Sequence, residues 1–166
     1  MKKILLLIAG ACLIQAQNPM SKETKDMYTA VKGYILKSAE KMPEANYSFK
    51  ASPDVRSYGA ILGHLIDDQY FFCAAAKGEA KESNAEKTIT TKAGLVEGLK
   101  AAFAYCDSSY DSLTDAKSGQ MMKFGRGERS LNGILNFNIA HDFEHYGNLI
   151  TYLRIKGLVP PSSEKQ

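Results

Sequence analysis

The stretch LNGILNFNIAHDFEHYGNLITYLRIK, residues 131–156, repeats apolar side chains at steps of three and four residues. Ser130 precedes it as a candidate N-cap, and Gly157 follows it at a C-cap position. The periodic apolar positions are Leu131, Ile134, Leu135, Leu149, Tyr152 and Leu153. This spacing predicts a long helix that buries one face in a core.

Three further segments have the same periodicity, at about residues 21–42, 57–76 and 91–113. Pro43 ends the first of them, and Gly78 follows the second at a C-cap position. Each segment carries one apolar stripe that must be buried against a neighbour. Four helices of this kind predict an all-α four-helix bundle.

The links between these helices have 14, 14 and 16 residues, which is longer than antiparallel neighbours require. At least one link can therefore cross the bundle from end to end, which allows two neighbouring helices to run parallel. Strand signals inside the links are weak. Residues 46–50 and 121–124 alternate briefly, which predicts short extended pieces but not a sheet.

Residues 1–16 are expected to be a secretory signal peptide rather than part of the fold. Lys2 and Lys3 precede an uncharged, mostly apolar stretch of 11 residues, too short for a membrane span of about 20. Residues 17–166 then form one domain, exported to the periplasm or secreted. The alternative is a lipoprotein anchored through Cys12, although Ala9 stands where the lipoprotein cleavage box usually has Leu.

The charge balance argues against nucleic acid as a partner. The chain has 21 Lys and Arg against 18 Asp and Glu, a formal charge of +3 that falls to +1 without the two leader lysines. No basic run or basic–aromatic patch remains that would bind a phosphate backbone.

Only three histidines are present, and all three fall on inward or near-inward helical positions. His141 and His145 are four residues apart on one face of the last helix, and His64 lies at the edge of the second apolar stripe. Three neutral imidazoles can hold a divalent transition metal and leave one coordination position open. The spacing alone also fits a polar core that Asp or Tyr neighbours satisfy.

Two stretches, residues 49–67 (FKASPDVRSYGAILGHLID) and residues 141–161, resemble the DinB-like (DNA-damage-inducible, YfiT-like) superfamily. That family carries one histidine on the second helix and an H-x-x-x-H pair on the fourth. The resemblance implies up-down-down-up topology, with the link after the second helix crossing between two parallel helices. It also implies a zinc or nickel ion held by His64, His141 and His145.

Several charged residues flank these histidines and are candidates to orient them, because a metal-bound histidine usually donates its second N–H to a carboxylate or carbonyl. The acidic candidates are Asp67, Asp68, Asp142 and Glu144. For Asp142 the preferred interpretation is a solvated helix face. Arg56 either clamps an anionic substrate or is an exposed arginine at a helix start.

Export would place Cys73 and Cys106 in an oxidising compartment. If the second and third helices run parallel, both cysteines lie about 22–24 Å from their helix starts, on apolar stripes. A disulfide is then expected, provided that the Cα atoms come within about 7 Å. Two buried free thiols are the alternative.

These features favour a metal-dependent enzyme of the transferase or hydrolase type, acting on an unknown small molecule. Some DinB-like relatives are similar to thiol-dependent transferases and isomerases, but low-molecular-weight thiols are scarce outside the cytoplasm. A non-catalytic metal or ligand-binding module and a plain scaffold are the alternatives. Bundles of this type can also form homodimers through an outer helix face.

Overall fold

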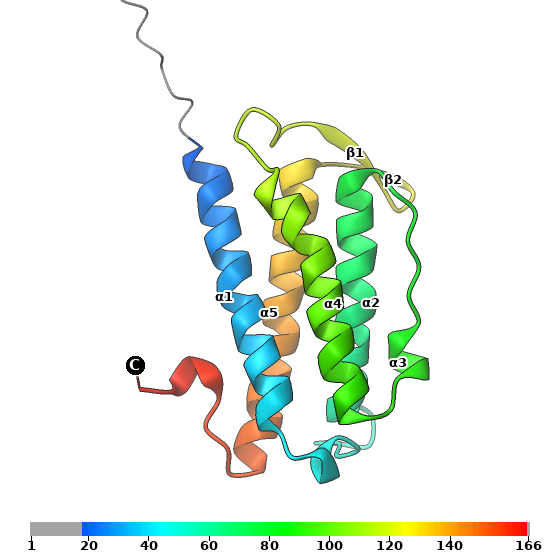
Figure 1. Ribbon diagram of the computed structural model, residues 1–166, viewed down its shortest axis with the longest axis vertical. Coiled ribbons are helices and arrows are strands. Elements are labelled where there is room, and N and C mark those ends of the chain that lie inside the picture. Colours follow the sequence, from blue (N-terminus) through cyan, green and yellow to red (C-terminus); the bar gives the residue numbers. More distant parts are fainter. Residues whose placement is uncertain (1–17, 166) are drawn as a thin grey trace, which may run out of the picture.

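The computed structural model describes residues 18–165, and the predicted leader lies outside the described residues. Four long helices lie side by side along its long axis (Figure 1). They are α1 (Pro19–Lys41), α2 (Tyr58–Lys77), α4 (Lys92–Asp111) and α5 (Leu131–Ile155). Helices α2 and α4 run parallel to each other and antiparallel to α1 and α5 (Figure 1). This arrangement confirms the all-α four-helix bundle with up-down-down-up topology.

The helix ends follow the capping residues that the sequence offers. The side chains of Ser57, Thr91 and Ser130 each accept a hydrogen bond from the backbone N–H three residues further on. Gly78 ends α2 with φ of 70°, in the left-handed region that favours glycine. The helix bounds agree with the predicted ones to within two residues.

The links contain short elements that the periodicity did not predict. Strands β1 (Met121–Phe124) and β2 (Gly127–Ser130) form an antiparallel hairpin, so the expectation of no sheet is wrong there. Residues 46–50 form no strand; the short 3-10 helix η1 (Glu44–Asn46) and a turn occupy this part of the first link. The one-turn helix α3 (Ala85–Thr88) lies in the crossover from α2 to α4, and η2 (Pro161–Ser163) follows α5.

The apolar stripes of the four long helices meet in a single core. Its fully buried members include Val31, Ile35, Leu62, Leu65, Leu99, Phe103, Ile134, Leu135, Leu149 and Leu153. Burial of this apolar surface supplies the main driving force for folding. Within residues 18–165, no helix is both long and apolar enough to span a membrane.

Helices α2 and α4 are joined by a disulfide between Cys73 and Cys106, whose Cα atoms are 5.3 Å apart. The two helices run parallel, so residues at similar distances from their starts lie at the same height (Figure 1). The disulfide predicted for parallel helices is thereby confirmed.

Candidate metal centre

The three histidines meet between α2 and α5. The Nε2 atoms of His141 and His145 are 3.2 Å apart. The ring centroid of His64 lies 5.3 Å from that of His141 and 4.8 Å from that of His145. The structure therefore brings together all three predicted residues.

Asp68, one turn after His64 on α2, is the fourth member of what we call the histidine cluster (His64, Asp68, His141 and His145). Its Oδ2 lies 2.9 Å from His64 Nε2 and 3.5 Å from His141 Nδ1. The four residues each offer one ligand atom, and these atoms all lie within 4.8 Å of one another. The cluster could hold a metal ion, because three imidazoles and one carboxylate suit a divalent transition metal.

Two atoms of the histidine cluster support this interpretation. Asp68 Oδ2 and His141 Nδ1 are buried atoms that make no hydrogen bond among the described residues and have only the ion-pair contacts given above. Leaving such atoms unsatisfied costs about 1–3 kcal/mol each. Metal–ligand bonds of about 2.0–2.2 Å place neighbouring ligands about 3 Å apart, close to the spacing of the two Nε2 atoms. The residues present therefore fit a metal ion.

His145 is nearly buried, with 6% of its surface exposed. Burial, followed by the positive charges of His141 and His64 when protonated, lowers the pKa of His145 to about 4. The ring is therefore neutral at neutral pH, which is the form in which imidazole binds a metal.

Asp142 is fully buried, so its interpretation as a solvated helix face is wrong. Its Oδ1 accepts a hydrogen bond from Gln69 Nε2 at 2.7 Å, whereas its Oδ2 makes none among the described residues. Asn138 in turn donates to Gln69 Oε1 and to the hydroxyl of Tyr110, both at 3.0 Å. We call these four residues (Gln69, Tyr110, Asn138 and Asp142) the closed polar cluster. Burial, and then the charge of Asp68, raises the pKa of Asp142, which favours its uncharged form.

The other two acidic candidates do not touch the imidazoles. Asp67 accepts hydrogen bonds from the backbone N–H groups of Ala85 at 2.6 Å and Glu86 at 3.1 Å, at the start of α3. Glu144 is exposed and lines the neighbouring pocket. The structure therefore assigns Asp67 to helix capping and Glu144 to the pocket wall.

Two residues that the sequence did not single out face the outer nitrogens of the histidines. Glu86 Oε2 lies 3.5 Å from His64 Nδ1, and the side-chain amide of Asn148 lies 3.3 Å from His145 Nδ1. Asn148 follows His145 by three residues on the same helix face, so periodicity could have identified it. Glu86 lies in the crossover link, where no periodic signal points to the histidines.

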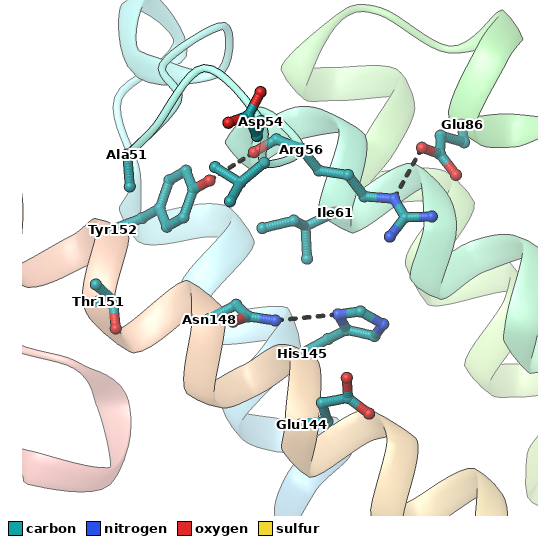
Figure 2. Close-up of a pocket in the computed structure, with 11 residues that line it drawn as sticks. Ala51, Asp54, Arg56, Ile61, Glu86, Glu144, His145, Asn148, Thr151 and Tyr152 are labelled. Carbon is teal, nitrogen blue, oxygen red and sulfur yellow. Dashed lines mark hydrogen bonds and ion pairs between the residues drawn. The ribbon is translucent and has the colours of Figure 1, made fainter.

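A pocket of about 740 Å³ opens beside His145. Figure 2 shows Ile61 and Tyr152 on its walls and Asn148 next to the imidazole. Arg56 lines the same pocket, and its Nε donates to Glu86 Oε1 at 2.9 Å. Arg56 therefore lies at a pocket, as a substrate clamp would require, but its guanidinium is already paired with the carboxylate of Glu86. A small molecule can therefore approach the histidine cluster from this pocket, on the side of His145.

Comparison with solved structures identifies the same fold in several proteins of low sequence identity. A DinB-like protein from Bacillus cereus has 16% identity and a TM-score of 0.73, covering 84% of this chain and 95% of that one. A DinB-like protein from Bacillus subtilis has 20% identity and a TM-score of 0.67, covering 87% and 99%.

A variant of the mycothiol-dependent maleylpyruvate isomerase is similar over 78% of this chain and 60% of its own, with 10% identity and a TM-score of 0.64. Among curated proteins no significant match was found. The sequence profile of the DinB superfamily matches residues 27–149, which include all four members of the histidine cluster. The chain belongs to the DinB superfamily.

Proposed function

We propose that this is an exported protein that binds zinc or nickel through His64, His141 and His145 and acts as a metal-dependent enzyme on a small molecule. The observation that carries the proposal is the half-buried histidine cluster, in which one Asp68 oxygen faces two imidazoles, beside a pocket of about 740 Å³. Pockets of about 300–1,000 Å³ are typical of small-molecule sites.

A divalent ion, when bound, supplies Lewis-acid chemistry, lowering the pKa of a bound water or thiol. The chain's own residues have distinct roles around it. His145 belongs to both the cluster and the pocket wall, so it joins the reacting centre to the substrate space. Ile61 and Tyr152 contribute walls that exclude water. Arg56 and Asn148 offer polar groups that orient a substrate.

Two reaction types fit this arrangement. The shared fold with a mycothiol-dependent isomerase supports thiol chemistry of the transferase or isomerase type. Export favours the hydrolase type, because hydrolysis needs no thiol co-substrate. The Cys73–Cys106 disulfide supports export, since disulfides persist mainly in oxidising compartments. The near-neutral charge balance supports a small molecule rather than a nucleic acid as partner.

Elemental analysis of protein purified without a histidine tag tests for the metal. We expect one zinc or nickel ion per chain, and its loss in His141→Ala. Asn136→Ala is the matched control, because Asn136 lies on the same helix and, among residues 18–165, hydrogen-bonds through its side chain only to Asn132 of that helix. Substoichiometric metal in the wild type, unchanged in His141→Ala, would instead indicate a scaffold.

Cobalt substitution separates an enzyme from a binding module. An enzyme needs an exchangeable coordination position, so the visible absorption of the Co²⁺-loaded protein should change when azide or a small thiol is added. A spectrum that stays constant with both ligands would indicate a saturated site and favour the non-catalytic binding module.

A further inference from the structure

Glu86, on the one-turn helix α3, contacts both the histidine cluster and the pocket. Its Oε2 lies 3.5 Å from His64 Nδ1, and its Oε1 accepts from Arg56 Nε at 2.9 Å. We propose that Glu86 is a positioning residue: it orients the imidazole of His64 toward the metal and holds the guanidinium of Arg56 at the pocket as an anchor for an anionic group of the substrate. The inference rests on the proposed metal site.

The backbone of Glu86 is fixed at the level of His64 by close packing. Gly63 precedes His64, and a Cβ atom at Gly63 would lie only 2.6 Å from Glu86 Cα and 2.9 Å from its nitrogen. Asp67 accepts hydrogen bonds from two successive N–H groups of α3, including that of Glu86. The missing side chain at Gly63 and the carboxylate of Asp67 together bring α3 against α2. Because the backbone is fixed, the distance between the Glu86 carboxylate and His64 depends on the length of the Glu86 side chain.

The orientation of His64 follows from which nitrogen faces which group. Its Nε2 faces the cluster, 2.9 Å from Asp68 Oδ2, while its Nδ1 faces Glu86. An imidazole that binds a cation through Nε2 carries its proton on Nδ1. At 3.5 Å the Glu86 carboxylate is at ion-pair distance from this outer N–H, and a carboxylate so placed favours this tautomer and ring orientation and makes the ligand more basic.

Arg56 is held at two points. Its backbone carbonyl accepts from the hydroxyl of Tyr152 at 2.5 Å, and its Nε donates to Glu86. Figure 2 shows the guanidinium between Glu86 and the ring of His145. The ion pair uses Nε, so the terminal N–H groups are the donors that a substrate can meet. A planar guanidinium of this kind matches a carboxylate or another small oxyanion.

Metal titration of the chelator-treated full chain tests the role of Glu86. Zn²⁺ affinity is measured by competition, and the visible spectrum of the Co²⁺-loaded protein reports the ligand geometry. We expect Glu86→Ala and Glu86→Asp each to weaken Zn²⁺ binding by about 10–100-fold and to shift the Co²⁺ bands. Glu86→Asp is decisive, because it keeps the charge but shortens the side chain by one methylene group. Glu82→Gln, at an exposed position in the same link, is the control and should match the wild type.

The outcomes separate the alternatives. Wild-type affinity and spectrum in Glu86→Asp, with weaker binding only in Glu86→Ala, would show that charge alone matters and overturn the proposal. Wild-type behaviour of both variants would overturn it as well. If Glu86→Ala fails to fold, Glu86→Asp still decides. If the wild type and Glu82→Gln bind no metal, the proposed function itself fails, whatever Glu86 does.

Substrate-class binding is tested separately, on the zinc-loaded protein, with succinate as the probe. We expect Arg56→Gln to weaken succinate binding by at least about 10-fold while Zn²⁺ remains bound, as the loss of a charge-assisted pair implies. Equal binding of succinate to both proteins, or no binding to the wild type, would overturn the role of Arg56 as an anion anchor.

Discussion

The closed polar cluster and the histidine cluster lie next to each other and share helices α2 and α5, with Tyr110 of α4 added to the first, yet their surroundings differ. Gln69, Asn138 and Tyr110 hydrogen-bond to one another or to the backbone inside the bundle. Each cluster also holds buried atoms that make no hydrogen bond among the described residues: Asp142 Oδ2 in the first, and Asp68 Oδ2 and His141 Nδ1 in the second. The histidine cluster differs because it borders the pocket, through His145. The hydropathy of the sequence does not distinguish the two clusters. The difference teaches that unsatisfied polar atoms next to a pocket, rather than polar burial itself, indicate a binding site.

The largest contrast should come from His145→Leu, which we expect to abolish stoichiometric metal binding. It should leave the unfolding free energy of the metal-free protein within about 1 kcal/mol of wild type, because the two partners that lose a hydrogen bond, His141 and Asn148, are half-buried and exposed and can bind water instead. Metal analysis and urea unfolding of the metal-free forms measure the two effects. A loss of several kcal/mol in the metal-free protein would mean that the histidine cluster is structural, like its neighbour.

Removal of the Cys73–Cys106 disulfide should affect stability alone. The bridge spans a sequence separation of 33 residues, for which loop-closure entropy gives about 4 kcal/mol. We expect the double variant Cys73→Ala, Cys106→Ala to lose stability of this order in urea unfolding, with metal affinity retained. Intact masses that are the same with and without reductant would show that the wild type lacks the bridge.

In the closed polar cluster, Asn138→Leu should destabilise the fold by about 1–3 kcal/mol, because Gln69 loses a partner in the core. The metal content should stay at the wild-type value. Asn136→Leu is the matched control on the same helix and should cost less, since within the described part of the chain the Asn136 side chain hydrogen-bonds only to its own helix. A similar loss in both variants would remove the special role of the closed polar cluster.

The smallest effect concerns pH. The pKa of His145 is lowered from 6.5 to about 4 in the folded state, so the unfolded state binds more protons between these values. The contribution of His145 is therefore fully present above pH 6.5 and is lost as the pH falls toward 4. The raised pKa of Asp142 acts in the opposite direction and reduces the net change. Urea unfolding of metal-free wild type and His145→Gln across this range should show a steeper decline in the wild type; parallel curves would contradict the shift.

Much of the fold and part of the site could be predicted from the sequence, because both depend on regular helical spacing. Periodicity located the long helices, and spacing together with family resemblance located the three histidines. The same spacing also held a signal for Asp142, which lies four residues after Asn138 and three before His145, on the inward face. The polar character of Asp142 outweighed that signal in the prediction.

The parts of the fold and of the site that could not be predicted depend on contacts between the links and residues distant in the sequence. Glu86 reaches His64 only because α3 docks on Gly63, a contact between residues 23 positions apart that no local pattern encodes. The hairpin was missed for a similar reason. Residues 121–124 show a weak strand signal, but their pairing with β2 depends on a turn and a partner strand that carry little apolar alternation.

The disulfide has a topological consequence for the crossover link. Residues 73–106 form a covalent ring closed by the two sulfur atoms, and α3 with Glu86 lies inside it. A protease that cuts the exposed link once therefore opens the ring without dividing the molecule in two. Under non-reducing conditions the nicked chain keeps its full mass plus one water, and Glu86 remains tethered to both helices that flank it.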